Sequence, residues 1–284
     1  MQDKQGIKDL FREDMKADFD FTQAPQLITP RGTETTGHKA IKTEDLSQWS
    51  KAQRSFLNWV KDKKVFTKEY IEGGKVAYDA FFKKRGSLRG NILDIGGGWG
   101  LYRQWWIPCA SSVFIVHDPG VERFLGGPHE LHLFYYQRAF SLPMSFIEGF
   151  GEDLPYKDSS FDTCLIAATL DHCMNPEKVL EEAYRCLKPG GVILVIQYCP
   201  SLSTKDRQSS ILKRLLKILL RPKHFLAVLH NSLFHPDHHI HHFGSLEITS
   251  LLKRARFSKV GTSTLPTLHN VCIFEAVKEY VNGT

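Results

Sequence analysis

The chain has 284 residues, of which 42% are hydrophobic and 24% are charged, and these fractions are typical of a folded globular protein and exclude wholesale disorder. At this length we expect one α/β domain with additional segments, and two full domains are the less favoured alternative. The formal net charge of +6 is mild and no dense run of Lys and Arg occurs, so we expect no nucleic-acid partner.

From the N-terminal residues we expect neither a signal peptide nor a transit peptide. The N-terminus mixes charges of both signs and lacks the uninterrupted apolar region of a signal peptide. Nowhere does an apolar run reach the length of about 18 residues that indicates a membrane-spanning helix. The six cysteines are scattered without CxxC spacing, which favours free thiols in a reducing compartment. We therefore expect a cytoplasmic protein.

The first 64 residues are polar and differ in composition from the rest of the chain. Gly, Pro and Thr are concentrated at 29–37, and the one clear apolar patch covers 49–60. We expect residues 1–64 to form an N-terminal extension that is partly ordered or acts as a lid. Apolar and aromatic residues then recur at roughly helical spacing over 67–84, which predicts a helix leading into the core.

From residue 91 onward, short apolar runs alternate with helix-sized segments. Five of these runs are expected to be buried strands, namely 91–95, 112–118, 144–148, 163–168 and 192–198. A helix is expected over 177–187, and Lys188-Pro189-Gly190-Gly191 ends it. Strands that alternate with helices imply βαβ units and a mainly parallel sheet.

The end of the chain, 244–284, is expected to complete the sheet of the core at 65–200. A helix is predicted over 245–256, and two strands at 260–265 and 270–277 would lie antiparallel at the sheet edge. The segment 201–243 is expected to be a helical insertion or cap. Its apolar and basic positions predict an amphipathic helix at 211–221, and packing as a lid is favoured over contact with a membrane.

A glycine-rich loop follows the first buried strand. Asp94 precedes it, and Gly96, Gly98 and Gly100 stand at alternate positions. Glycine lets the backbone approach a ligand closely, so the loop is typical of a nucleotide cradle. The spacing is tighter than the G-x-G-x-x-G fingerprint, which disfavours a dinucleotide. Asp118 lies about 20 residues beyond the loop, where an acid can accept hydrogen bonds from ribose hydroxyls; its alternative role is that of a turn residue.

Four motifs, taken jointly and in this order, resemble the class I S-adenosylmethionine-dependent methyltransferases. They are Leu93-Asp94-Ile95-Gly96-Gly97-Gly98-Trp99-Gly100, Glu152-Asp153-Leu154-Pro155-Tyr156-Lys157-Asp158-Ser159-Ser160-Phe161-Asp162, Leu170-Asp171-His172-Cys173 and Leu187-Lys188-Pro189-Gly190-Gly191. The resemblance covers residues 90–200. It implies a Rossmann-like methyltransferase fold with a mainly parallel seven-stranded sheet, an antiparallel edge hairpin and helices on both faces. It also implies S-adenosyl-L-methionine as the cofactor and S-adenosyl-L-homocysteine as the product.

The resemblance implies cofactor-binding roles for a set of residues in these motifs. They are Asp94, Gly96, Gly97, Gly98, Asp118, Gly151, Glu152 and Ala168. Asp94 would order the loop or meet the methionine part, and Asp118 would hold the ribose. Gly151 and Glu152 would approach the adenine. The family often has an Asp two residues before that Glu, where this chain has Phe150, so stacking and backbone contacts would hold the adenine instead.

A histidine-rich stretch is the second notable feature. Its members lie within thirteen residues and are His230, His235, His238, His239, His241 and His242. If 237–243 is extended, Asp237, His239 and His241 share one face. Substrate binding or base catalysis is favoured there, turn and packing roles are the alternative, and a metal is the least favoured. The candidate bases are His172, His239 and His241; for His172 a packing role is the equal alternative, and we assign no metal ligand.

These features predict an enzyme that methylates a small molecule. We expect O- or N-methylation of a sugar, a quinone or a secondary metabolite. No Asn/Asp-Pro-Pro-Tyr motif follows the fourth strand, which disfavours amides and exocyclic amines as acceptors. Two alternatives stay open, namely a lipid or membrane-associated methyltransferase, suggested by 211–221, and a non-catalytic cofactor-binding protein.

Overall fold

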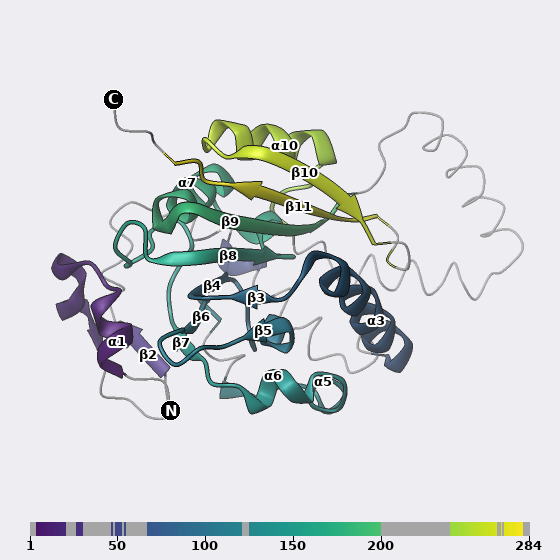
Figure 1. Cartoon of the computed structure of the whole chain (residues 1–284), viewed down its shortest axis with the longest axis horizontal. Helices are drawn as coiled ribbons and strands as arrows, with labels where there is room; N and C mark the ends of the chain where they lie inside the picture. The colour runs from purple at the N-terminus through teal and green to yellow at the C-terminus, as the bar shows by residue number, and fades with distance from the viewer. Residues whose placement is uncertain are drawn as a thin grey trace, which may run out of the picture.

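A nine-stranded sheet with the order β1-β2-β7-β6-β4-β8-β9-β11-β10 forms the centre of the molecule (Figure 1). The computed structural model describes residues 4–20, 27–30, 47, 49–52, 54, 67–120, 125–199, 239–265, 268 and 270–280. The strands of the sheet are β1 (Phe19–Asp20), β2 (Leu27–Pro30), β4 (Ile92–Ile95), β6 (Phe114–His117), β7 (Ser145–Ile147), β8 (Phe161–Ala167), β9 (Leu187–Tyr198), β10 (Ser258–Thr264) and β11 (Val271–Val277). A separate parallel pair consists of β3 (Leu88–Arg89) and β5 (Trp106–Ile107).

Helices occupy the connections between the strands. The α-helices are α1 (Lys4–Asp9), α3 (Lys68–Arg85), α5 (Glu130–Tyr135), α6 (Gln137–Ser141), α7 (Pro176–Cys186) and α10 (Ser245–Arg254). Short 3-10 helices are η1 (Glu13–Asp18), η3 (Leu101–Trp105) and η4 (Leu170–His172). The helices predicted over 67–84, 177–187 and 245–256 are therefore confirmed as α3, α7 and α10.

Seven of the nine strands are the sheet predicted from the sequence. β7, β6, β4, β8 and β9 run parallel, β11 is antiparallel to β9, and β10 is antiparallel to β11. β4 and β6 are buried along their whole length, which explains their uninterrupted apolar sequence. At the opposite edge β2 pairs parallel with β7 and β1 pairs antiparallel with β2. The N-terminal segment thus adds two strands that the sequence pattern did not indicate.

The chain changes its direction across the sheet at β4. It passes from β4 to β6 and β7 on one side, and then crosses to β8 and β9 on the other. In open α/β sheets, ligands bind outside the carboxyl ends of the strands at the point where the strand order reverses. The topology therefore favours a binding site at the carboxyl end of β4.

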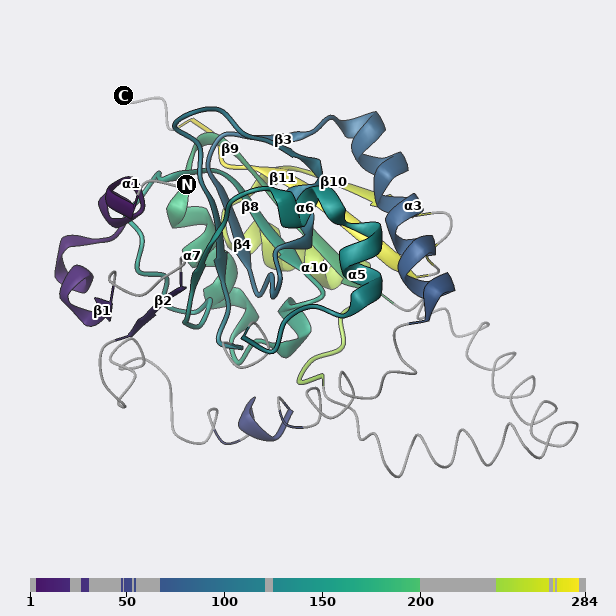
Figure 2. The ribbon, with the colours of Figure 1, turned by 90° about the horizontal axis from the view of Figure 1, so that it is seen from below.

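Hydrophobic cores lie on both faces of the sheet. Leu93 and Ile95 of β4 point into one core, which includes Val179 of α7, while Ile92 points into the other, which includes Phe82 of α3. Figure 2 shows α3, α5 and α6 together on one side of the sheet. The predicted covering of both faces by helices is confirmed.

The described part of the N-terminal extension is packed into the domain. Phe11 is completely buried, and its ring contacts those of Phe19 and Tyr156 edge-on with centroid distances of 5.2 Å in both pairs. The backbone N–H of Lys157 donates to the carbonyl of Leu10 at 2.8 Å. Residues 4–20 are therefore part of one hydrophobic core with the sheet, although the boundary expected at residue 64 stays a prediction.

The expected helical insertion stays untested, whereas the expected free cysteines are confirmed. Most of the insertion at 201–243, including the amphipathic segment 211–221, lies outside the described residues and stays a prediction. All six cysteines lie within the described residues and are free thiols. Among the helices that the structure describes, none combines the length and the apolar composition that crossing a bilayer requires.

Replacing Phe11 by Ala tests whether the N-terminal segment belongs to the core. Phe11→Ala empties a completely buried ring site, so we expect urea unfolding to give a free energy of unfolding lower by about 3 to 5 kcal/mol. Phe134→Ala is the matched control, because this ring is 65% exposed, and we expect a loss below about 1 kcal/mol. Equal small losses in both variants would contradict the integral role of residues 4–20.

Candidate functional site

A pocket opens at the carboxyl ends of β4, β6 and β8, where the strand order reverses. Its empty space, with the open mouth included, is about 570 Å³. The site residues predicted from the sequence that line it are Gly96, Asp118, Gly151, Glu152, Ala168 and His172. The other lining residues are Trp49, Ile95, His117, Pro119, Phe150, Thr169 and Cys173.

The glycine loop adopts a backbone that only glycine accommodates easily. Gly96, Gly98 and Gly100 have φ values of 70°, 52° and 62°, in the left-handed region that side chains disfavour. A Cβ at Gly96 would strike the side chain of Thr169, and a Cβ at Gly97 would strike the carboxylate of Asp94. The loop therefore packs closely on both neighbours, and its backbone is left open to the pocket at Gly96.

Asp118 connects the end of β6 to the glycine loop. Its Oδ2 accepts a hydrogen bond from the N–H of Gly98 at 2.9 Å, and its Oδ1 accepts one from the N–H of Gly120 at 2.6 Å. The residue is only 3% exposed, yet it lines the pocket. The bond to Gly120 is the turn contact that the sequence offered as the alternative role. The bond to Gly98 places the carboxylate beside the glycine loop, and the ribose role stays a prediction.

Asp94 is a completely buried carboxyl beside Gly97. Neither of its oxygens has a hydrogen-bond partner among the residues that the structure describes. Burial first, and the negative charge of Asp118 second, raise the pKa of Asp94 to about 8, while the positive charge of Arg103 acts in the opposite direction. Arg103 is fixed by donating to the carbonyl of Gly100 at 3.0 Å. The loop thus rests on a carboxyl group that a nearby cation would stabilise in its charged form.

Glu152 and Phe150 form the next part of the pocket wall. The Oε1 of Glu152 accepts hydrogen bonds from the N–H groups of Met174 and Asn175, at 2.8 and 3.1 Å, just before α7. Burial raises the pKa of Glu152, although these N–H groups favour its charged form. The ring of Trp49 meets that of Phe150 edge-on, with centroids 4.6 Å apart. Where the family often carries an Asp, this pocket therefore has an aromatic wall.

Ala168 and Thr169 close the pocket at the end of β8. Ala168 has a φ of 49°, which is uncommon for a residue with a side chain, and its N–H donates to the carbonyl of Ile196 at 2.8 Å. The hydroxyl of Thr169 lies 3.2 Å from the carbonyl oxygen of Gly96 and 3.0 Å from that of Ala167. This turn brings β8 into contact with the glycine loop.

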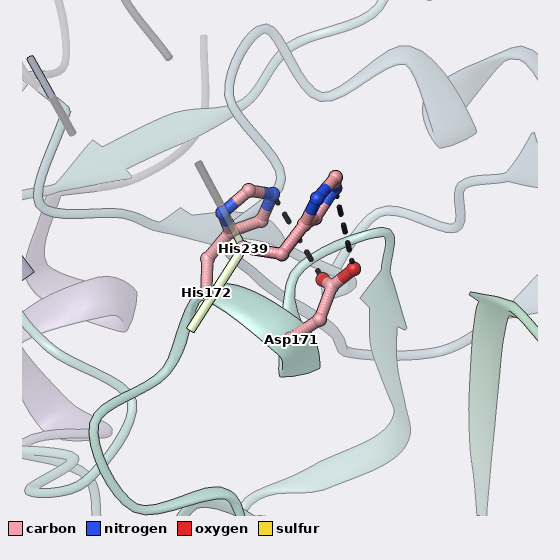
Figure 3. A group of neighbouring side chains, drawn as sticks. All are labelled: Asp171, His172 and His239. Carbon is pink, nitrogen blue, oxygen red and sulfur yellow. Dashed lines mark ion pairs between the residues drawn. The ribbon is translucent and has the colours of Figure 1, made fainter. Parts of the chain in front are cut away.

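His172 and His239, which lie far apart in the sequence, meet at Asp171 (Figure 3). The Nε2 of His172 lies 3.9 Å from Oδ1 of Asp171, and the Nε2 of His239 lies 3.6 Å from Oδ2. The two imidazole rings have centroids 4.9 Å apart. The backbone carbonyl of Asp171 also accepts the N–H groups of Ile240 and His241, at 2.8 and 3.0 Å. The end of the histidine-rich stretch is thereby attached to the pocket wall.

The remaining candidate histidine, His241, lies differently from the prediction. Its ring stacks on that of Phe243, with centroids 5.6 Å apart and an interplanar angle of 23°, and it does not line the pocket. The rings of His239 and His242 lie 5.9 Å apart, although an extended segment would put them on opposite faces. Residues 239–243 are not a strand, so the assumed alternation does not apply. His230, His235 and His238 lie outside the described residues.

Several site residues were not found by sequence reasoning. Asp171 stands inside one of the family motifs, next to His172, and this position was the available signal. His117 precedes Asp118. Its Nδ1 lies 3.0 Å from the hydroxyl of Tyr156, and its Nε2 lies 3.2 Å from the carbonyl oxygen of Phe150. Trp49 reaches the pocket from a separate segment, so only the tertiary structure reveals it.

Residues 93–195 match the family model described as a methyltransferase domain. The 2-methyl-6-phytyl-1,4-hydroquinone methyltransferase 1 of rice (Oryza sativa subsp. japonica) is 32% identical over 105 residues, which are 37% of this chain and 30% of the relative. The 2-methoxy-6-polyprenyl-1,4-benzoquinol methylase of Dictyostelium discoideum is 28% identical over 102 residues, 36% of this chain and 32% of the relative. The chain therefore spans about a third of the length of these curated relatives.

A similar fold occurs in a solved structure from Thermotoga maritima. That protein is described as an S-adenosylmethionine-dependent methyltransferase and a possible histamine N-methyltransferase. It is 20% identical, with a TM-score of 0.51, and the match covers 82% of this chain and 100% of the other. At this identity the likeness establishes the fold, and it supports the sheet topology derived above.

The raised pKa of Asp94 predicts how stability depends on pH. An unfolded Asp titrates near 4, so between pH 4 and about 8 the folded state holds a proton that the unfolded state releases. The free energy of unfolding from denaturant titrations should therefore fall as pH rises through this window, by at most about 1.4 kcal/mol per pH unit. Asp94→Asn should flatten this dependence, and Asp14→Asn, at an exposed carboxylate, should not. Identical pH slopes in wild type and Asp94→Asn would contradict the assignment.

Proposed function

We propose that the protein is a class I S-adenosylmethionine-dependent methyltransferase that methylates an oxygen or nitrogen atom of a small molecule, and the match of residues 93–195 to a methyltransferase-domain model supports this. The observation that carries the proposal is the hydrogen bond between the glycine loop and Asp118, which lies in the wall of the pocket at the carboxyl ends of the strands. A sugar, a quinone or a secondary metabolite is the proposed acceptor. The names of the two curated relatives, which specify a hydroquinone and a benzoquinol, support the quinone class.

Several residues support the binding of S-adenosylmethionine in this pocket. Gly96 lines the pocket without a side chain, and a Cβ there would strike Thr169, so a ligand would meet the glycine backbone directly. Asp118 would accept hydrogen bonds from the ribose hydroxyls, and Phe150 with Gly151 offers an aromatic face and a backbone for the adenine. Burial raises the pKa of Asp94 to about 8, and a cationic ligand nearby would favour the charged form of this carboxyl.

The remaining task of the chain is to hold the acceptor and to exclude water. When bound, S-adenosylmethionine supplies a methyl group on a positively charged sulfur, which is already a strong electrophile. The protein therefore contributes mostly by aligning the acceptor atom with that group in a closed site. Ala168, Thr169 and His172 form the wall at the end of β8, and this is the proposed acceptor side of the pocket.

An imidazole near the acceptor can remove the proton that a hydroxyl loses on methylation. His172, His239 and His241 are the proposed bases, because neutral imidazole accepts a proton near neutral pH. Asp171 lies 3.6 Å from the Nε2 of His239 and would stabilise the imidazolium that forms. Of the three, His172 lines the pocket, so we propose it as the first candidate.

We also propose that the protein is cytoplasmic. Its proposed partner is a small molecule, and we propose that it does not bind nucleic acid. The membrane-associated alternative rests on 211–221, outside the described residues. The non-catalytic alternative would be a protein that binds S-adenosylmethionine but methylates no member of an acceptor panel.

Removing the carboxylate of Asp118 should weaken cofactor binding. A hydrogen bond to a charged group contributes about 1.5 to 3 kcal/mol, so we expect roughly ten- to hundredfold weaker binding of S-adenosylhomocysteine by Asp118→Ala in calorimetry. Asp14→Ala, at a carboxylate that is 78% exposed, is the matched control and should bind as wild type does. Asp118→Asn keeps a side-chain oxygen that can accept the N–H of Gly98. Comparing it with Asp118→Ala shows whether the lost affinity for S-adenosylhomocysteine comes from unfolding of the loop. Unchanged affinity in folded Asp118→Ala would remove this residue from the site.

Changing the candidate bases should affect turnover more than cofactor affinity. A mass-spectrometric screen of hydroxyl and amine compounds identifies an acceptor, and turnover is then measured between pH 5 and 9. A lost general base typically costs about 10² to 10⁴ in kcat, so we expect such a loss for His172→Ala, with a smaller one for His241→Ala. His129→Ala, at the beginning of α5 and outside the pocket lining, is the control. Unchanged turnover of His172→Ala, His239→Ala and His241→Ala at every pH would exclude base catalysis by these residues.

A further inference from the structure

Three potential metal ligands converge at the wall of the pocket. Asp171 and His172 belong to η4 at the end of β8, and His239 reaches them from the end of the histidine-rich stretch. One ligand atom from each residue lies within 4.8 Å of the other two (Figure 3). Two imidazole nitrogens and one carboxylate are a donor set that zinc and similar divalent ions prefer.

The distances within this group fit ligands around an ion better than direct hydrogen bonds. The contacts from Asp171 to His172 and His239, at 3.9 and 3.6 Å, are longer than the roughly 2.7 to 3.2 Å of a hydrogen bond. Ligands at about 2.0 to 2.1 Å from a tetrahedral zinc ion are separated by roughly 3.4 Å. Small side-chain movements would therefore bring the three atoms to coordination distance.

The burial of Asp171 gives a second, independent observation. Its side chain is only 9% exposed, and its Oδ1 has no hydrogen-bond partner among the described residues. A buried carboxyl oxygen without a hydrogen bond is unfavourable, and coordination to a divalent cation would satisfy it. The side chains of His172 and His239 are 13% and 35% exposed, so the group is shielded from solvent and still reachable.

The backbone holds the ligands together without the ion. The carbonyl of Asp171 accepts the N–H groups of Ile240 and His241, so the residue before them, His239, stays beside Asp171. Asp171 and His172 are neighbours in the sequence, and the N–H of His172 donates to the carbonyl of Thr169 at 2.9 Å. This arrangement reduces the entropy that the chain would lose on binding an ion.

We propose that Asp171, His172 and His239 bind a divalent cation of the zinc class. Three protein ligands leave a coordination position open, as in catalytic zinc sites, and His172 places the ion at the pocket wall. The binding of the ion does not depend on methyl transfer. In the ion-bound protein the two imidazoles are ligands, so an ion-bound water would take over the role of proton acceptor from them.

Metal titration of the full chain tests this proposal. The purified protein is treated with a chelator and titrated with Zn²⁺ in a calorimeter and with Co²⁺, whose visible spectrum reports its ligands. We expect one ion per chain. Asp171→Asn, His172→Ala and His239→Ala should each weaken binding at least roughly 100-fold, since even outer-shell changes cost about 10- to 100-fold. His129→Ala, which removes a histidine outside the pocket lining, should bind as wild type does.

The variants at Asp171 and His172 make the outcome decisive. Both lie outside the histidine-rich stretch, so ion binding that persists in folded Asp171→Asn and His172→Ala would assign the ion to other residues and overturn the proposal. Absence of saturable binding in the wild type would also overturn it. S-adenosylhomocysteine titrated into the same samples separates the proposed metal site from the proposed methyltransferase function. Binding of S-adenosylhomocysteine without binding of an ion would contradict the metal site and leave the methyltransferase function standing.

Discussion

The hydrogen bond from the N–H of Gly98 to the carboxylate of Asp118 is the contact on which the pocket depends. It ties the loop after β4 to the end of the adjacent strand β6, and an ionised acceptor makes such a bond roughly twice as strong as a neutral one. On the other side, Thr169 fills the space that a side chain at Gly96 would need. The loop is therefore fixed between β6 and β8, and its glycine backbone lines the pocket at Gly96.

Asp171 holds a second part of the chain in place, next to the pocket residue His172. Its backbone carbonyl holds the chain at Ile240 and His241, and its carboxylate faces His172 and His239. The end of the insertion is thereby held beside His172, which lines the pocket. The proposed cofactor side and the proposed acceptor side are thus set by two buried carboxylates, one at the end of β6 and one just after β8.

The sequence predicted the central fold because parallel strands buried on both faces leave uninterrupted apolar runs, as in β4 and β6. It did not indicate β1 and β2, which are short and form only against the edge at β7. Of the site residues predicted from the sequence, Gly96, Asp118, Gly151, Glu152, Ala168 and His172 line the pocket, and their binding roles stay predictions. Trp49 was missed because tertiary contacts alone bring it there, and His241 was misplaced because 239–243 is not an extended strand.

A crystal structure of the full chain with S-adenosylhomocysteine tests the central claim most directly. The account predicts the ligand in the pocket at the ends of β4, β6 and β8, with its ribose hydroxyls on Asp118 and its adenine beside Phe150 and Gly151. A ligand bound elsewhere, or a pocket that stays empty at a saturating concentration of the ligand, would contradict the account.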